Sequence, residues 1–331
     1  MSSMGSACAR RRLRGRTARA ACAVGTAATL FGTAACAAGA GGGGAGGGDD
    51  KVAVIGSFYP MAWVAQRVAG SAASVTTLTK PGAEPHDLEL TPRQIVDVAR
   101  ADLIVYIKGL QPAVDQAIDQ HAKDKAVDAV SLMRTLPVSG TTNAGARGSG
   151  GSGQSHGRGA RDPHLWLDPG RLATVATTVA NRLTASDPGH AATYQANARA
   201  LVADLHTLAG AFATGLHACR QKVIVTSHAA FAYLAERYGL TQVSVAGIDP
   251  QAEPSPARLA ALTGEIHRTG ATTVFTETLA SPKVAQTLAR EAGARTAILD
   301  PVEGLPAGSK GDYLSIMRQN LQTLRSALGC S

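Results

Sequence analysis

The chain has 331 residues, 45% of them hydrophobic, and its mean hydropathy is near zero. It is therefore long enough to bury one large or two medium cores, and its composition excludes a membrane-embedded bundle. The formal net charge is +8, but six arginines and no acidic residue lie in residues 1–35. The other 26 basic and 24 acidic residues nearly balance, which argues against a nucleic-acid partner.

Residues 1–35 are predicted to be a secretion signal. Their basic start precedes an apolar run, Ala20–Ala35, that is too short to span a bilayer permanently. Residues 33–36, Thr-Ala-Ala-Cys, resemble a bacterial lipobox, so Cys36 is the predicted lipidation site. Plain cleavage at an A-x-A-like site is the alternative, and the run of arginines at 10–12 leaves twin-arginine export open.

Residues 36–50 are almost all Gly and Ala, which is typical of a flexible tether. A lipid, a tether and a folded body are the layout of a protein anchored to the outer face of the cytoplasmic membrane. Without acylation the same chain would be free in the periplasm or outside the cell.

Short apolar runs alternate with helical patterns through residues 51–186, which predicts an α/β half with a mostly parallel sheet. The expected strands of this half are Val52–Ile55, Val75–Leu78, Leu103–Ile107 and Val127–Val130. Thr91 followed by Pro92 predicts a helix start, with Thr as the N-cap.

The segment 139–161 has eight glycines, four serines, three arginines and no acid, so it is predicted to be a disordered surface loop. Its one histidine, His156, is interpreted as having no ligand role.

Residues 162–169, Asp-Pro-His-Leu-Trp-Leu-Asp-Pro, form a segment that we call the arch. Each proline fixes its own φ and keeps the preceding residue extended, so the arch is predicted to be stiff and to present His164. The alternative is that Asp168 only caps the next helix, Trp166 only fills the core and His164 is incidental.

A helix is expected over Arg171–Leu183, and a second begins at Asp187-Pro188 and covers 187–217. At this length, roughly 45 Å, the second helix is predicted to link two lobes as a rigid strut. Residues 218–331 repeat the α/β pattern, with expected strands at Val223–Thr226, Gln242–Val245, Thr272–Phe275 and Arg295–Leu299.

Three polar residues come after the ends of expected strands: His86, His228 and Asp300. Ligands of open parallel sheets bind outside the carboxyl ends of the strands, so these residues and His164 are the candidate site. Three imidazoles and one carboxylate suit tetrahedral Zn²⁺, whereas Ca²⁺ and Mg²⁺ prefer oxygen shells. Glu84 could support His86, replace it as a ligand, or be a surface acid in a turn.

These motifs in this order resemble the solute-binding proteins that deliver zinc or manganese to bacterial ABC importers. The likeness rests on Gly82–Asp87, the arch, Thr226–Phe231, Leu299–Pro301 and Gly311–Tyr313, and extends from about Lys51 to the end of the chain. It implies two α/β lobes, each with a mostly parallel sheet flanked by helices, joined by one long rigid helix with the metal between the lobes. The implied ligands are His86, His164, His228 and Asp300.

The resemblance implies a transport protein, not an enzyme, that works with a permease, and we expect a monomer. Manganese members tend to have Glu where this chain has His228, and imidazole favours zinc, so Zn²⁺ is the predicted transported ligand. A manganese member, a zinc hydrolase and a zinc-holding adhesin or scaffold are the alternatives. An H-E-x-x-H helix motif is absent from the sequence, which argues against the hydrolase.

Cys219 and Cys330 remain after the leader cysteines and Cys36 are set aside. In an exported protein an even remainder predicts a disulfide, which would tie the final helix to the second lobe. Metal ligation by this pair is the alternative.

Overall fold

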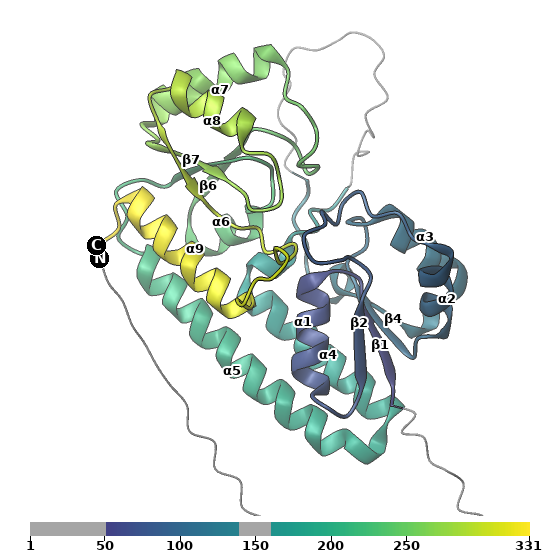
Figure 1. The fold of residues 1–331 in the computed structure, drawn as a ribbon. Helices are drawn as coiled ribbons and strands as arrows, with labels where there is room; N and C mark the ends of the chain where they lie inside the picture. The colour runs from purple at the N-terminus through teal and green to yellow at the C-terminus, as the bar shows by residue number, and fades with distance from the viewer. Residues whose placement is uncertain (1–50, 139–159) are drawn as a thin grey trace, which may run out of the picture. The chain divides into compact units, whose positions relative to one another are not determined.

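The computed structural model describes residues 51–138 and 160–331 (Figure 1). The predicted secretion signal, lipidation at Cys36, the tether and the predicted loop up to residue 159, with His156, lie outside the described residues. No helix in the described ranges is long and apolar enough to cross a membrane.

The first lobe is built on a sheet of four parallel strands in the order β2-β1-β3-β4. The strands are β1 (Ala53–Gly56), β2 (Ser74–Thr77), β3 (Leu103–Tyr106) and β4 (Ala126–Asp128). Its helices are α1 (Tyr59–Ala69), α2 (Pro92–Arg100) and α3 (Pro112–His121). Ile55 and Ile104 pack in one apolar cluster with α2 and α3, whereas Val54 and Val105 pack in another with α1. The sheet is therefore covered on both faces, as parallel sheets generally are.

The second lobe repeats this plan with four parallel strands in the order β6-β5-β7-β8. The strands are β5 (Val223–Thr226), β6 (Thr241–Ser244), β7 (Thr273–Thr276) and β8 (Arg295–Ile298). Its helices are α6 (Ala232–Tyr238), α7 (Pro256–Thr269), α8 (Lys283–Glu291) and α9 (Tyr313–Leu328). Val225 and Val274 pack against α7 and α8, and Ile224 and Phe275 point into the core on the other face.

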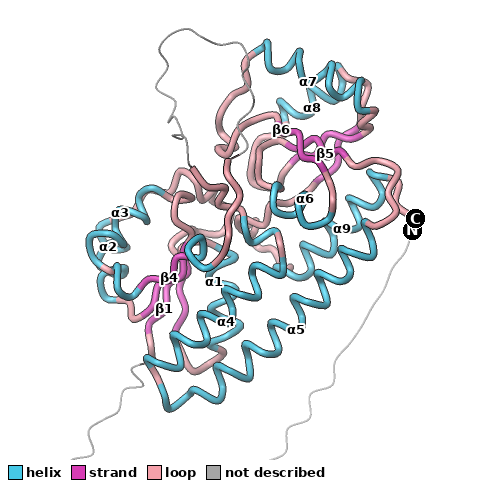
Figure 2. Tube along the Cα trace, turned by 180° about the vertical axis from the view of Figure 1, so that it is seen from behind, coloured by secondary structure: helices cyan, strands magenta, loops and turns pink. Residues whose placement is uncertain are grey.

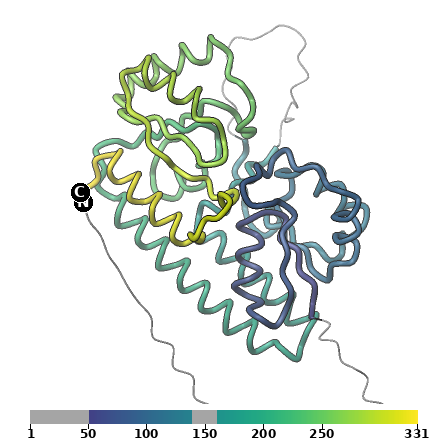
Figure 3. The backbone as a smooth tube through the Cα atoms, viewed as in Figure 1, coloured from purple at the N-terminus to yellow at the C-terminus, as the bar shows by residue number. Residues whose placement is uncertain are grey.

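Two long helices connect the lobes: α4 (Pro169–Ser186) and α5 (Ala191–Leu216), separated by a 3₁₀ turn at Pro188–His190. Helix α5 contacts α1 and α4 of the first lobe and α6 and α9 of the second, and its course is visible from both sides (Figures 1 and 2). The backbone trace follows the chain from the first lobe through α4 and α5 into the second (Figure 3). The predicted two-lobe α/β fold with a long linking helix is confirmed.

One apolar cluster extends through both lobes along α5, whose buried residues include Leu201, Leu205 and Phe212. Residues Asp49–Ser331 accordingly form one compact unit. Separating the lobes would expose part of this shared core to water, which costs free energy in proportion to the apolar area exposed. The exact domain limits at 187 and 217 stay predictions.

The structure joins Cys219 and Cys330 by a disulfide. Cys219 follows α5 and Cys330 follows α9, so the bond ties the end of the last helix to the start of the second lobe. The two cysteines are 111 residues apart in sequence. In the chain-entropy account, closing a loop of about 100 residues contributes about 4.7 kcal/mol to stability.

Candidate metal site

Four buried side chains converge between the two lobes: His86, His164, His228 and Glu303. One ligand atom from each lies within 4.8 Å of all the others. His86 follows β2, and His164 lies in the arch before α4, so both come from the first lobe. His228 follows β5 and Glu303 follows β8, so both come from the second lobe. Neither lobe alone supplies the group.

The distances from Glu303 to the three rings are those expected between ligands of a tetrahedral metal. Glu303 Oε1 lies 3.3 Å from His86 Nε2, 3.4 Å from His164 Nε2 and 3.2 Å from His228 Nε2. Bonds of roughly 2.0–2.1 Å to a tetrahedral Zn²⁺ place neighbouring ligand atoms about 3.3–3.4 Å apart. These three distances are therefore close to the edge length of a zinc-sized tetrahedron.

An acid-Pro-His sequence supports two of the histidines in the same way. In Glu84-Pro85-His86 the backbone N–H of His86 donates to Glu84 Oε2 over 3.0 Å. In Asp162-Pro163-His164 the backbone N–H of His164 donates to Asp162 Oδ1 over 2.9 Å. The proline keeps the acidic residue extended, which lets its side chain fold back onto the histidine. The acid thus fixes the turn that presents each ring.

Two histidines are also held by their Nδ1 atoms. His164 Nδ1 donates to Asp162 Oδ1 over 2.9 Å, and His228 Nδ1 donates to Glu277 Oε1 over 2.7 Å. A carboxylate only accepts, so the proton of each neutral ring is assigned to Nδ1 and the lone pair of Nε2 faces Glu303. The Nε2 lone pairs and the buried carboxylate of Glu303 repel one another. The arrangement therefore needs a cation, or a proton, at its centre.

Burial and charge oppose one another at these groups. Burial favours the neutral imidazole, but the carboxylates of Glu277 and Glu303 raise the pKa of His228 well above its ordinary value. For Glu303, burial favours the neutral acid, yet His228 and the other two rings hold the pKa of its carboxyl well below the usual range. Without a metal, both shifts favour a proton on a ring beside a charged Glu303.

The arch is fixed by the core as well as by its prolines. Trp166 is fully buried and its Nε1 donates to Pro301 O over 2.7 Å, while Tyr313 donates to Trp166 O over 2.6 Å. Asp168 caps α4 by accepting from Gly170 N. Asp168 thus does cap the next helix and Trp166 does fill the core, as the alternative interpretation of the arch proposed. Both roles coexist with a His164 ring that faces the site.

Asp300 lies next to this group but outside it. Its Oδ1 accepts from Val302 N over 2.7 Å and its Oδ2 accepts from Thr278 Oγ1 over 2.9 Å. Both carboxylate oxygens are thus engaged by neighbours, and Glu303 supplies the carboxylate that faces the three histidines. The structure brings together the three predicted histidines with Glu303 in the position for which the sequence suggested Asp300.

Glu303 and Glu277 were not recognised in the sequence. Glu277 directly follows β7, so its place at the carboxyl edge of the sheet was a usable signal. Glu303 lies three residues beyond Asp300, where only the path of the turn decides which carboxylate enters the site. Glu84, an expected accessory residue, contacts the His86 backbone and is not one of the four clustered side chains.

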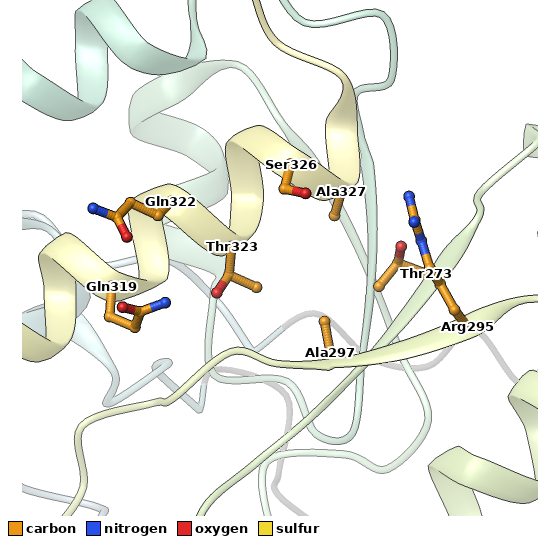
Figure 4. Close-up of a pocket in the computed structure, with 8 residues that line it drawn as sticks. All are labelled: Thr273, Arg295, Ala297, Gln319, Gln322, Thr323, Ser326 and Ala327. Atoms are coloured by element: carbon orange, nitrogen blue, oxygen red, sulfur yellow. The ribbon is translucent and has the colours of Figure 1, made fainter.

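A separate pocket of about 330 Å³ opens between β8 and α9 (Figure 4). It is lined by Thr273, Arg295, Ala297, Gln319, Gln322, Thr323, Ser326 and Ala327. None of the four clustered side chains lines it, and its polar lining offers hydroxyls, amides and one cation rather than metal ligands.

Comparison with known proteins identifies a family. Residues 54–327 match the family described as ZnuA, the periplasmic component A of the zinc-uptake complex. The chain is 36% identical over 285 residues to the zinc-binding lipoprotein AdcA of Streptococcus pneumoniae, covering 84% of this chain and 56% of AdcA. The chain thus spans about half the length of that relative.

Two further matches extend over nearly the whole length of the matched protein or domain. The high-affinity zinc uptake system protein ZnuA of Bacillus subtilis is 32% identical over 320 residues, covering 91% of this chain and 95% of that protein. The crystal structure of the Zn(II)-bound ZnuA-like domain of S. pneumoniae AdcA matches with a TM-score of 0.70 and 34% identity. That match covers 84% of this chain and 99% of the domain.

Proposed function

We propose that this chain, which belongs to the ZnuA family of zinc-uptake components, captures Zn²⁺ between its lobes and delivers it to an ABC importer permease. The observation that carries the proposal is the convergence of three buried Nε2 atoms on Glu303 Oε1 at 3.2–3.4 Å. The relatives AdcA and ZnuA, whose names state zinc binding and zinc uptake, support the same cargo. The metal is the transported substrate of this site.

The donor set favours zinc over manganese. Imidazole suits Zn²⁺, whereas Mn²⁺ prefers carboxylate and carbonyl oxygens, and this group has three imidazoles and one carboxylate. The buried position adds a second preference, since Mn²⁺ commonly takes six ligands and four side chains enclose this centre.

Capture also fits the site better than hydrolysis. A catalytic zinc keeps one position for a reactive water, whereas structural sites are closed by four protein ligands. Here Glu303 occupies the fourth corner, and the side chains of His164, His228 and Glu303 are almost completely buried. We therefore propose binding and release, without a chemical reaction on a substrate.

Purified full-length chain exposed to equal Zn²⁺ and Mn²⁺ should retain one zinc per chain, because three of its four donors are imidazoles. Elemental analysis after gel filtration measures this. The matched variant His228→Glu should shift retention toward manganese. Preferential manganese retention by the unmodified chain would overturn the zinc assignment.

Export and anchoring are part of the proposal. We propose that the protein is held on the outer face of the cytoplasmic membrane by a lipid on Cys36, where it can meet its permease as a monomer. The lipoprotein name of AdcA supports this location. A membrane-bound carrier on a tether stays close to the permease, which raises its effective concentration there.

Cys36→Ala should release the protein from the membrane fraction, because an acyl chain needs the cysteine thiol and a Gly-rich tether has no membrane affinity of its own. Immunoblots of membrane and soluble fractions measure the change. Cys22→Ala, a cysteine change outside residues 33–36, is the matched control and should remain with the membranes. If Cys36→Ala also remains there, Cys36 is not the anchor.

A further inference from the structure

The turn Asp300–Glu303 connects β8 to the side chain that completes the site, and its backbone is unusual. Val302 has a φ of +57° and is the only non-glycine residue with a positive φ in the described part of the chain. A β-branched side chain is strongly disfavoured in this region. Such a conformation persists only where its surroundings enforce it, and such residues cluster at functional sites.

Asp300 supplies the contact that enforces it. Its Oδ1 accepts the Val302 N–H over 2.7 Å, which closes a turn between the carboxylate and the backbone two residues later. Its Oδ2 accepts from Thr278 Oγ1 over 2.9 Å, so the carboxylate cannot rotate away without losing a second hydrogen bond. Asp300 is only 7% exposed, so this contact is shielded from competing water.

The residues before Val302 are fixed on both sides. Asn320 on α9 accepts from Asp300 N over 2.9 Å, and its Nδ2 donates to Asp300 O over 2.6 Å. Trp166 Nε1 donates to Pro301 O over 2.7 Å. Because these hydrogen bonds hold Asp300 and Pro301 in place, the dihedrals of Val302 set the direction in which the backbone continues to Glu303.

We propose that Asp300 is a positioning residue: it holds Val302 in the left-handed region and so aims Glu303 at the three histidines, without itself contacting the metal. This inference rests on the proposed zinc-binding function and deepens it. A change of Val302 to a negative φ would rotate the chain beyond it and remove Glu303 Oε1 from its place within 3.4 Å of three Nε2 atoms. Catalytic and binding sites depend on ligand placement to about 0.5 Å.

The test separates hydrogen bonding from ligation at Asp300. Asp300→Asn keeps an oxygen that accepts from Val302 N–H, whereas Asp300→Ala removes it. On full-length chain we would measure zinc affinity by chelator competition and the visible absorption of the Co²⁺-loaded protein, which reports ligand geometry. Asp300→Ala should bind zinc roughly 10–100-fold more weakly, the usual loss for an outer partner of a ligand, and show an altered Co²⁺ spectrum.

Three comparisons test whether the hydrogen bond and the strained backbone of Val302 account for the loss. Asp300→Asn should keep the unmodified spectrum and most of the affinity. Val302→Gly added to Asp300→Ala should recover part of both, because glycine adopts a positive φ without steric cost. Thr278→Val, a milder change at a solvent-exposed residue, should give a smaller loss of the same kind and covers the case that Asp300→Ala does not fold.

The outcomes distinguish this inference from the proposed function. If the unmodified chain binds zinc but Asp300→Asn loses as much as Asp300→Ala, Asp300 acts through its charge and the positioning role is wrong. Unmodified affinity and spectrum in Asp300→Ala would overturn it equally. If the unmodified chain does not bind zinc, the proposed function fails as well.

Discussion

Replacing His164 or His228 by alanine should weaken zinc binding by more than the roughly 10–100-fold typical of changes outside the ligand shell. Each substitution removes an imidazole ligand and leaves an orienting carboxylate, Asp162 or Glu277, buried with the backbone N–H of that position but without the ring N–H. Both rings are fully buried, so water cannot readily replace the lost nitrogen. Chelator competition with purified variants measures the loss.

The matched control is His190→Ala. His190 lies in the turn between α4 and α5, is exposed, and pairs with Asp187 away from the cluster. It should bind zinc as the unmodified chain does. Asp300→Ala should lose less affinity than either buried histidine variant. Unchanged affinity in both His164→Ala and His228→Ala would mean that the metal binds elsewhere, and the inter-lobe site would have to be abandoned.

The fold could be predicted from the sequence because its signals are local. Each of the eight expected strands lies within two residues of an observed one. The run Leu103–Tyr106 is apolar throughout, since a central parallel strand is buried on both faces. Thr91 caps its helix with the reciprocal hydrogen bonds of a capping box to Gln94. Neighbouring residues alone specify such features.

The three histidines could be predicted for a similar reason. His86 and His228 follow strands whose carboxyl ends lie at the site, and the prolines of the arch restrict the backbone around His164. The repeated acid-Pro-His sequence was also visible. The hydrogen bond from each histidine N–H to the preceding carboxylate is a property of the folded turn, which the sequence alone does not specify.

The fourth ligand position could not be assigned in this way, because it depends on one dihedral angle. Asp300 and Glu303 are three residues apart, and a strand ending at Ile298 places either one near the site. The positive φ of Val302 directs Glu303 inward, and valine gives no sequence signal for that conformation.

Zinc should leave the protein as the pH falls, and the loss should begin above the ordinary histidine value of about 6.5. A ligating imidazole must be neutral, so protons compete with the metal for Nε2. Burial opposes protonation, but Glu277 and Glu303 together raise the pKa of His228 well above its usual value in the metal-free state. The apparent zinc affinity should therefore have its full value above the raised pKa of His228 and should decrease as the pH falls through that pKa.

The carboxylate of Glu303 should not be the first group to titrate, because the surrounding histidines hold its pKa well below the usual range. Competition titrations from pH 5 to 9, corrected for protonation of the chelator, measure the midpoint. The matched variant Glu277→Gln can still accept from His228 Nδ1 but lacks the charge that raises the ring pKa. Its midpoint should therefore move to lower pH, separately from any change in affinity at alkaline pH. An unchanged midpoint would mean that His228 is not the group whose proton competes with zinc.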